Sequence, residues 1–309
     1  MKNRKIIVTG CNGFIGFHVT KHLLENDYIV AGIDNQDNYY NVSLKRKRLS
    51  ILSKFKSFNF YKKNIIDKNL KNLLKKINPG VIINLAAQPG VRYSFINPQK
   101  YIDTNIKGFL NILESMKENG IKKLIYASSS SVYGNNKSFP TKENVALNPE
   151  NIYGMTKVFN EQLAEFYFKK FKINSVGLRF FTVYGKLGRP DMFIPKVITN
   201  IKTNKSIMLF NNGNHYRDFT YVEDVSKLIL NIVKKISLAK KPKHNVYNVS
   251  YGSSVKIINL INQVSKFIGK KPKIIGKEFQ LGDMYKTYGD NTKIKKIFKF
   301  KNLVDYKSG

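Results

Sequence analysis

Hydrophobic residues in the first 180 positions gather in short runs that alternate with longer amphipathic stretches. The runs span residues 5–9, 28–34, 58–61, 81–86, 123–128 and 176–181. Several of them are apolar throughout, which is typical of strands that are buried on both faces. Strands that alternate with helices predict a parallel sheet covered by helices on both sides. We therefore expect an α/β fold built on a doubly wound parallel sheet.

The alternation breaks after about residue 180. Segments 207–210, 217–222 and 247–249 are shorter and lie between loops, which predicts a second, smaller α/β domain. We expect residues 1–180 to form the first domain and residues 181–309 to form most of the second. The chain has 309 residues, of which 42% are hydrophobic and 13% aromatic, so it can bury such cores and does not resemble a disordered chain.

A loop with three glycines follows the first predicted strand. Gly10, Gly13 and Gly16 would let the backbone approach a phosphate closely, and free amides at the start of the next helix would attract a dinucleotide pyrophosphate. The second apolar run ends in Asp34, 18 residues after Gly16, where an acid would bind the adenosine ribose. Because a carboxylate there would repel the extra phosphate of NADP, we predict NAD as the cofactor.

A serine-rich segment, residues 128–134, follows the fifth run. Tyr153 comes 24 residues after Ser129, and Lys157 comes four residues after Tyr153. Asn148, followed by a proline and an acid, predicts a helix start, so both side chains would share one helix face. A nearby ammonium group and a positive nicotinamide would both stabilise a phenolate. Tyr153 is therefore a candidate proton shuttle.

The large positive net charge of the chain does not by itself predict a nucleic-acid-binding protein. The chain has 54 Lys and Arg against 20 Asp and Glu, a formal net charge of +34, which is a property of many nucleic-acid-binding proteins. Only seven of these cations are arginines, and the lysines are spread along the whole chain. This favours a composition bias on solvated faces over a specific nucleic-acid site. A catalytically idle protein of the same fold that binds nucleic acid through its basic surface remains the alternative of a different class.

Several other classes of site are not expected. A single cysteine, Cys11, excludes an intramolecular disulfide and a cysteine-rich zinc site, and histidines only at positions 18, 22, 215 and 244 predict no metal centre. No segment has the roughly 20 apolar residues of a membrane span, so no membrane partner is predicted. The chain opens almost directly on its first strand, which leaves no room for a signal peptide and predicts a cytoplasmic location.

The combined motifs resemble the extended short-chain dehydrogenase/reductase family of nucleotide-sugar enzymes over nearly the whole chain. The glycine loop, Asp34 with Asn35, the serine-rich segment and the pair Tyr153 and Lys157 carry this resemblance. Further segments look like those of the UDP-glucuronate 4-epimerases: residues 85–94, 178–185, 188–192 and 217–221. The resemblance implies a Rossmann-type first domain and a UDP-sugar substrate bound mainly by the second.

By this resemblance, the expected reaction is reversible C4 epimerisation of UDP-glucuronate to UDP-galacturonate through a 4-keto intermediate with tightly bound NAD. Tyr153 would take the 4-hydroxyl proton, Ser129 would hydrogen-bond that oxygen, and Lys157 would hold the nicotinamide ribose. The residues implied to contact NAD are Gly10, Gly13, Phe14, Ile15, Gly16, Asp34, Asn35, Asn64, Ile65, Leu85, Ala86, Ala87, Asn105, Tyr153, Lys157 and Phe180.

A UDP-sugar carries a pyrophosphate, and a glucuronate adds a carboxylate that can leave as carbon dioxide once C4 is oxidised. We expect arginines to bind the anionic groups and hydroxyls to hold the sugar carboxylate, with an aromatic side chain beside the uracil. The candidate substrate contacts are Arg92, Ser128, Ser130, Thr182, Arg189, Phe210 and Arg217.

Related dehydratases carry an acid and base pair just before the Val-Tyr-Gly segment, and decarboxylases often have a glutamate there. This chain has Ser130 and Ser131 instead, which favours epimerisation. UDP-glucose or an N-acetylated UDP-hexosamine or uronate remains open as the substrate. The family implies a homodimer formed through the helices that contain residues 106–116 and 153–168. Similar enzymes begin a closing helix about where this sequence stops, so we expect that helix to be missing.

Overall fold

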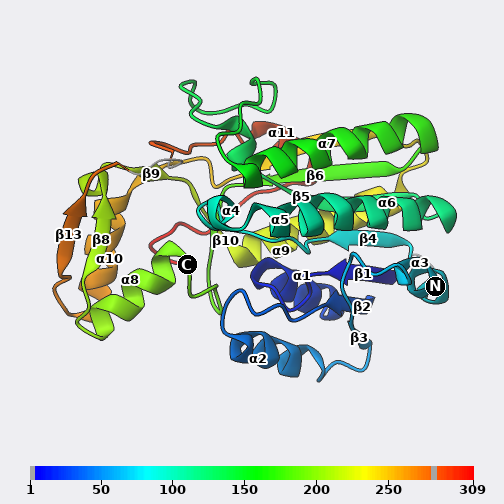
Figure 1. The fold of residues 1–309 in the computed structure, drawn as a ribbon, viewed down its shortest axis with the longest axis horizontal. Helices are drawn as coiled ribbons and strands as arrows, with labels where there is room; N and C mark the ends of the chain where they lie inside the picture. The colour runs from blue at the N-terminus through cyan, green and yellow to red at the C-terminus, as the bar shows by residue number, and fades with distance from the viewer. Residues whose placement is uncertain (1–3, 280–283) are drawn as a thin grey trace.

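The computed structural model describes residues 4–279 and 284–309. Its central layer is a parallel sheet of seven strands in the order β3-β2-β1-β4-β5-β6-β11 (Figure 1). The strands are β1 (Lys5–Thr9), β2 (Ile29–Asp34), β3 (Phe58–Lys62), β4 (Val81–Asn84), β5 (Lys123–Ser129), β6 (Asn174–Phe180) and β11 (His244–Val249). The predicted doubly wound, Rossmann-type sheet is confirmed. Its order reverses between β1 and β4, where such sheets bind ligands at the carboxyl ends of their strands.

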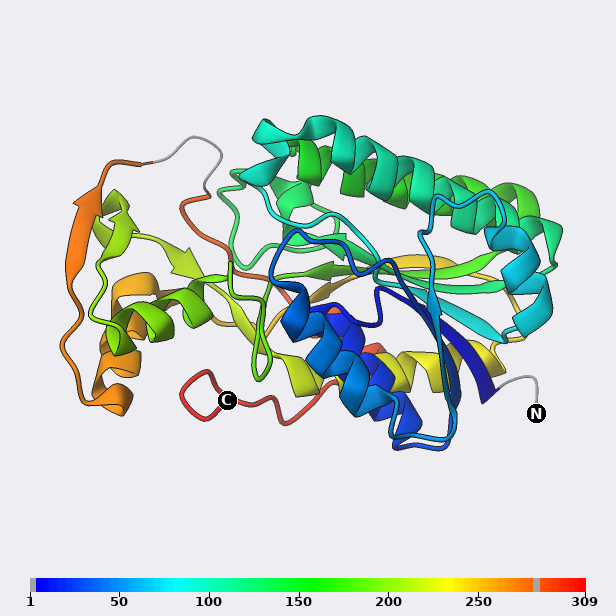
Figure 2. The ribbon, with the colours of Figure 1, turned by 60° about the horizontal axis from the view of Figure 1, so that its bottom comes forward.

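Helices cover both faces of this sheet (Figures 1 and 2). One face carries α1 (Phe14–Leu24), α2 (Val42–Leu52), α9 (Val222–Leu238) and α11 (Thr292–Phe298). The other carries α3 (Leu70–Ile77), the π-helix η2 (Ile102–Lys107), α6 (Gly108–Glu118) and α7 (Ile152–Phe171), with α4 (Tyr93–Ile96) and α5 (Pro98–Tyr101) leading into η2. In the described part of the chain, no helix is both long and apolar enough to cross a membrane.

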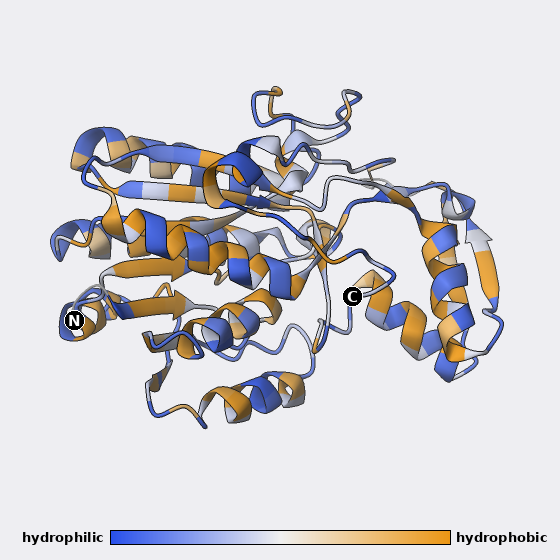
Figure 3. Cartoon of the chain, turned by 180° about the vertical axis from the view of Figure 1, so that it is seen from behind, coloured by the Kyte–Doolittle hydropathy of each residue, from blue (hydrophilic) through white to orange (hydrophobic). Residues whose placement is uncertain are grey.

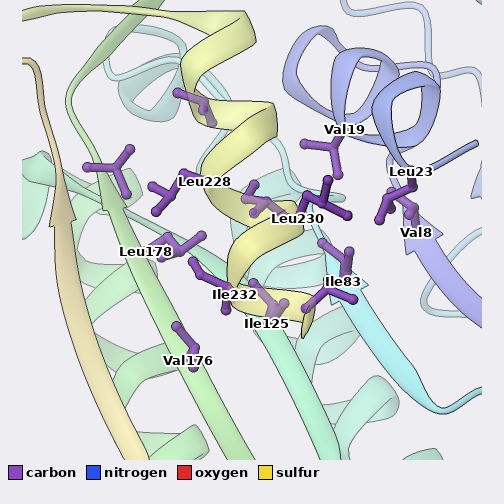
Figure 4. Packing of buried hydrophobic residues seen from close by; sticks show 14 of the residues in the cluster. Val8, Val19, Leu23, Ile83, Ile125, Val176, Leu178, Leu228, Leu230 and Ile232 are labelled. Atoms are coloured by element: carbon purple, nitrogen blue, oxygen red, sulfur yellow. The ribbon is translucent and has the colours of Figure 1, made fainter. Parts of the chain in front are cut away.

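The core follows from strands that are buried on both faces. In β1, Ile6 and Val8 pack with α1 and α9, whereas Ile7 packs on the opposite side of the sheet. The strands are largely hydrophobic along their length, while the helices have mixed sides (Figure 3). In one of the two clusters, Ile125 of β5 lies beside Ile232 of α9 (Figure 4). Burying each such side chain contributes roughly 1.5–3 kcal/mol, so the two clusters make the sheet a rigid platform.

A smaller unit lies beyond one end of the sheet (Figure 1). Its core is formed by α8 (Phe193–Lys202), α10 (Ile257–Ile268) and the parallel pair β8 (Ile207–Phe210) and β13 (Ile274–Lys277). Two short pairs connect it to the sheet: β7 (Thr182–Tyr184) with β10 (Phe219–Tyr221), and β9 (Tyr216–Arg217) with β12 (Val255–Lys256). The short helices η3 (Ser130–Tyr133) and η4 (Asn211–Gly213) follow β5 and β8.

Residues 247–249 lie in the central sheet and not in the smaller unit. The sequence placed residues 247–249 in the second domain, but this was wrong: they end β11, which extends the central sheet by pairing Val249 with Phe180 of β6. The reason is that Asn248 interrupts the apolar run. Its side chain is fully buried, accepts a hydrogen bond from Tyr133 and donates to the Thr141 carbonyl. The chain therefore returns to the first domain after residue 180, through α9 as well as β11.

Candidate active site and cofactor cleft

A cavity of about 420 Å³ runs along the carboxyl ends of the central strands and continues toward the smaller unit. Among the predicted NAD contacts, all except Asn105 line it. Among the predicted substrate contacts, all except Arg92 and Phe210 line it. Residues from segments far apart in the sequence thus meet in one cleft.

The glycine loop packs so tightly that side chains would not fit. A Cβ atom on Gly16 would lie 2.0 Å from the Gly10 carbonyl oxygen, and one on Gly10 would lie 2.8 Å from the Ala86 nitrogen. Gly10 also has a φ of +71°, which favours glycine. Gly13 is the N-cap of α1 and has no side chain to occupy the amides of the first turn. Those amides and the open backbone surface fit the pyrophosphate of NAD.

Asp34 marks the other end of the cofactor cleft. Its side chain is buried, and its two carboxylate oxygens accept hydrogen bonds from the Asn12 nitrogen, at 3.0 Å, and the Gln36 nitrogen, at 2.7 Å. These bonds fix the carboxylate at the end of β2, where it lines the cavity together with Asn35. The carboxylate can accept further bonds from ribose hydroxyls, so the residues present fit the adenosine half of NAD.

Arg48 is a site-forming residue that the sequence did not single out. It is fully buried in α2 and donates to the Asn12 carbonyl at 2.9 Å, the Tyr40 hydroxyl at 2.6 Å and the Leu187 carbonyl at 2.5 Å. It therefore joins the glycine loop to the loop before Arg189. Its sequence context, a run of Lys and Arg, carried no signal for a buried cation.

Tyr153 and Lys157 share α7, as predicted, but the helix begins differently. The N-cap is Asn151, whose side chain accepts a hydrogen bond from the Gly154 nitrogen at 2.8 Å. The prediction that Asn148 caps the helix was wrong, because Asn148 lies in the preceding loop and its nitrogen donates to the Val132 carbonyl. Both residues are capping types, and their local sequence did not distinguish them.

The two side chains differ in their surroundings. Tyr153 is half-buried, whereas Lys157 is 3% exposed and donates to the Ala127 carbonyl at 3.0 Å. Burial raises the pKa of the Tyr153 phenol, and a hydrogen bond with Ser129 partly opposes this. Burial lowers the pKa of Lys157 to about 8, against the effect of the Glu161 carboxylate, which raises it. Since burial dominates at Tyr153, a positive charge nearby would be needed to favour the phenolate.

The serines after β5 have different partners. The Ser129 hydroxyl accepts a hydrogen bond from the Ser131 nitrogen at 3.1 Å and donates to the Ser131 hydroxyl at 3.2 Å, and Ser129 lines the cavity together with Tyr153. The Ser128 hydroxyl instead donates to Glu161 at 2.5 Å. Because the Ser128 hydroxyl already donates to Glu161, this bond argues against the prediction that Ser128 donates to the sugar carboxylate. Ser130 and Thr182 line the cavity.

Asn105 does not line the cavity but forms hydrogen bonds with residues next to it. It is buried in the π-helix η2, where its side-chain nitrogen donates to the Gln88 carbonyl and to the Thr156 hydroxyl, both at 3.1 Å. Its side-chain oxygen accepts a bond from the Gln88 nitrogen at 2.8 Å. It therefore connects the loop after β4 to α7, while its neighbour Thr104 lines the cavity.

Two of the cations predicted to bind substrate, Arg189 and Arg217, line the cavity. Arg189 makes a two-point ion pair with Asp191, with Nε at 3.0 Å and a terminal nitrogen at 2.5 Å. Arg217 lies at the end of β9 and donates to the Tyr216 carbonyl at 2.9 Å. Both line the cavity, so its far end is suited to anionic groups.

The remaining two candidates lie together. The guanidinium of Arg92 is 4.6 Å from the centroid of the Phe210 ring, a cation–π contact. Arg92 precedes α4 in the first domain, whereas Phe210 ends β8 in the smaller unit. The contact therefore bridges the two parts of the molecule beside the cleft.

Known proteins match the chain over nearly its whole length. The model of the NAD dependent epimerase/dehydratase family matches residues 6–250. Protein CapI of Staphylococcus aureus is 40% identical over 302 residues, covering 93% of this chain and 90% of the relative. The UDP-glucuronate 4-epimerase of Thermodesulfobacterium geofontis is 36% identical over 306 residues, covering 98% and 93%.

The structural comparison gives the same result. The crystal structure of UDP-glucuronic acid 4-epimerase from Bacillus cereus in complex with UDP-glucuronic acid and NAD superimposes with a TM-score of 0.92 and 33% identity. The match covers 99% of this chain and 96% of that one. The glycine loop, Asp34 and the group of Ser129, Tyr153 and Lys157 line one cleft, and the chain belongs to the NAD dependent epimerase/dehydratase family.

Proposed function

We propose that this chain catalyses the reversible C4 epimerisation of UDP-glucuronate to UDP-galacturonate with tightly bound NAD. One observation carries the proposal: Tyr153, Lys157 and Ser129 line the same cavity as the glycine loop and Arg189. A dinucleotide and an anionic sugar would meet at these side chains. Two of the named relatives, from Thermodesulfobacterium geofontis and Bacillus cereus, are UDP-glucuronate 4-epimerases, which supports the same substrate.

NAD supplies the acceptor for the hydride of sugar C4 and, once reduced, the donor that returns it to the opposite face. The first-turn amides of α1 hold the pyrophosphate, and Asp34 holds the adenosine ribose. Lys157 uses one N–H on the Ala127 carbonyl, which leaves two for the hydroxyls of the nicotinamide ribose. The hydrophobic residues Ile65 and Leu85 line the cofactor part of the cleft.

Tyr153 takes the proton of the 4-hydroxyl as C4 becomes a carbonyl, and it returns that proton after the ketone has turned over. Ser129 hydrogen-bonds the same oxygen and the phenol, which keeps the two aligned. The Lys157 ammonium, whose Nζ atom lies 5.8 Å from the centroid of the Tyr153 ring, stabilises the phenolate, because a nearby positive charge favours the ionised form. No other proton donor is needed for the reaction.

The side chains at the end of β5 favour retention of the sugar's substituents. Water elimination needs an acid and a base at this place, but residues 130 and 131 are both serines. Oxidation at C4 makes the C5 carboxylate part of a β-keto acid, which loses carbon dioxide easily. We assign Ser130 and Thr182, which line the cavity, to hold this carboxylate in a geometry that prevents its loss.

A product analysis tests the proposed substrate. Purified protein is incubated separately with UDP-glucuronate, UDP-glucose and UDP-N-acetylglucosamine, and the nucleotide sugars are separated by ion exchange. We expect UDP-galacturonate from UDP-glucuronate and at least tenfold slower turnover of the two neutral sugars. Faster turnover of UDP-glucose than of UDP-glucuronate would contradict the proposed substrate and indicate a UDP-glucose 4-epimerase with the same C4 chemistry.

A homodimer through α6 and α7 is the second part of the proposal. These helices expose large apolar side chains, namely Leu110, Met155, Phe159 and Phe166. Met155 is 58% exposed and Phe166 is 50% exposed, and such surfaces commonly mark subunit contacts. Light scattering of the wild type and of Phe159→Glu tests it: a dimer that becomes a monomer supports the interface, and a wild-type monomer contradicts it.

A further inference from the structure

The catalytic face of α7 carries a third functional side chain. Tyr153, Lys157 and Glu161 follow at intervals of four residues, so they share one side of the helix. The mechanism proposed above uses the first two. Glu161 is 6% exposed and Lys157 is 3% exposed, so the carboxylate and the amine are both withdrawn from water.

Glu161 is held in place by two strands. One carboxylate oxygen accepts hydrogen bonds from the Ser128 hydroxyl at 2.5 Å and from Nε of Arg179 at 2.9 Å. The other oxygen accepts a bond from a terminal nitrogen of Arg179 at 2.7 Å. Ser128 lies in β5 and Arg179 in β6, so Glu161 connects α7 to both strand ends beneath the active site.

Arg179 is in turn fixed on its far side. Its second terminal nitrogen donates to the Tyr133 hydroxyl at 2.8 Å and to the Glu143 carbonyl at 3.0 Å. The Glu161 carboxylate therefore has no freedom to turn. Burying an ion pair costs more desolvation energy than a well-packed apolar pair would, so stability alone is a weak reason for its presence.

The charged and titratable groups packed around Lys157 are few. They are Tyr153 and Glu161 on α7 and, behind Glu161, Arg179 on β6, while β5 contributes the neutral Ala127 carbonyl. Within the described part of the chain, Glu161 is the charge that acts on Lys157. Its carboxylate raises the pKa of Lys157, burial lowers it more strongly, and the resulting pKa is about 8.

We propose that Glu161 is a positioning residue that keeps the Lys157 side chain in its ammonium form and binds the Ser128 hydroxyl. This inference rests on the proposed epimerase function and deepens it. A buried lysine without a neighbouring carboxylate readily becomes neutral. A neutral Lys157 would no longer stabilise the Tyr153 phenolate, and Glu161 would thus control the reaction without touching substrate or cofactor.

The test compares wild type with Glu161→Gln, which keeps the shape and removes the charge. The turnover number for UDP-glucuronate is measured from pH 5.5 to pH 9.5. We expect the loss of activity on the alkaline side to move to lower pH by about one unit or more, a tenfold change in the protonation equilibrium. A profile that keeps the wild-type shape at uniformly reduced activity would overturn the proposal, because it would indicate a structural role only.

A second measurement does not require turnover. The ε-carbon of Lys157 is followed by NMR in labelled protein, and its signal is identified by its loss in Lys157→Met. We expect this signal to titrate at lower pH in Glu161→Gln than in wild type, and an unchanged titration overturns the inference. If wild type turns over no UDP-sugar while the titration still moves, the proposed function fails and the assignment of Glu161 stands.

Three further variants complete the design. Glu161→Asp keeps the charge and is expected to restore the wild-type pH profile. Glu165→Gln is the matched control, since Glu165 lies one turn further along α7 and pairs with Lys169 on the surface. If Glu161→Gln leaves Arg179 uncompensated and does not fold, the double variant Glu161→Gln with Arg179→Met removes both charges, and a smaller shift in the same direction is expected.

Discussion

The Nζ atom of Lys157 lies 5.8 Å from the centroid of the Tyr153 ring, one turn away on the same helix. The amine is buried and fixed on the Ala127 carbonyl, so this spacing does not depend on a flexible surface side chain. Both residues line the cavity, and the bond to Ala127 ties Lys157 to β5. This relationship is the basis on which we propose Tyr153 as the proton-transfer group.

Replacing Tyr153 by phenylalanine removes the proton acceptor and leaves the ring. We expect turnover to fall on the order of 10²–10⁴-fold, with NAD and UDP-glucuronate still bound. Steady-state kinetics and NAD content check this. The control is Tyr126→Phe, because the Tyr126 hydroxyl is buried without a hydrogen-bond partner in the described part of the chain. Loss of activity in the control, or activity within tenfold of wild type in Tyr153→Phe, contradicts the assignment.

Replacing Asp34 by asparagine tests the cofactor site. The carboxylate would accept charge-assisted hydrogen bonds from the ribose, and such bonds contribute about 1.5–3 kcal/mol, so NAD binding should weaken roughly 10- to 150-fold. The NAD content of the purified protein and titration calorimetry measure this. Asp27→Asn, in the exposed turn before β2, is the charge-matched control. Undiminished NAD binding in Asp34→Asn would remove Asp34 from the site.

Arg48 and Arg46 provide a matched pair on one helix. Arg48→Met removes three buried hydrogen bonds between the glycine loop and the Leu187 loop, and we expect it to lower the free energy of unfolding by about 2–4 kcal/mol. Arg46→Met changes an exposed side chain and should alter it by less than about 0.5 kcal/mol. Urea unfolding of both variants makes the comparison, and equal effects would contradict the structural role given to Arg48.

Thr182→Val tests the protection of the sugar carboxylate. The variant loses the hydroxyl and keeps the shape, so we expect part of the product to become a UDP-pentose and carbon dioxide. Thr182→Ser keeps the hydroxyl and should give no pentose. Nucleotide-sugar chromatography separates the products. Epimerisation by Thr182→Val without any decarboxylation would show that Thr182 does not hold the carboxylate.

Much of the site could be predicted because its signals are local in the sequence. The spacing of Gly10, Gly13 and Gly16 after an apolar strand predicts a phosphate loop, and four residues between Tyr153 and Lys157 predict one helix face. In the same way, uninterrupted apolar runs predict strands that are buried on both sides. All of these features follow from the period of one element and its immediate neighbours.

The rest depends on contacts between distant segments. Glu161 becomes informative only when β5 and β6 bring Ser128 and Arg179 to it, and Arg48 only when α2 packs on the glycine loop. Asn248 interrupts the apolar pattern of the edge strand β11, and its buried polar side chain is satisfied by Tyr133 of another element. Buried polar groups with distant partners leave no periodic signal, so pattern reasoning assigns them to surfaces or loops.

The most direct test of the mechanism uses UDP-glucuronate that carries deuterium at C4. If Tyr153 moves only the hydroxyl proton and the hydride leaves and returns within one enzyme molecule, the UDP-galacturonate formed in ordinary water retains deuterium at C4. NMR and mass spectrometry of the product measure the retention. We predict nearly complete retention with no added NAD. Exchange of the label with solvent, or a requirement for free NAD in every turnover, would contradict the account.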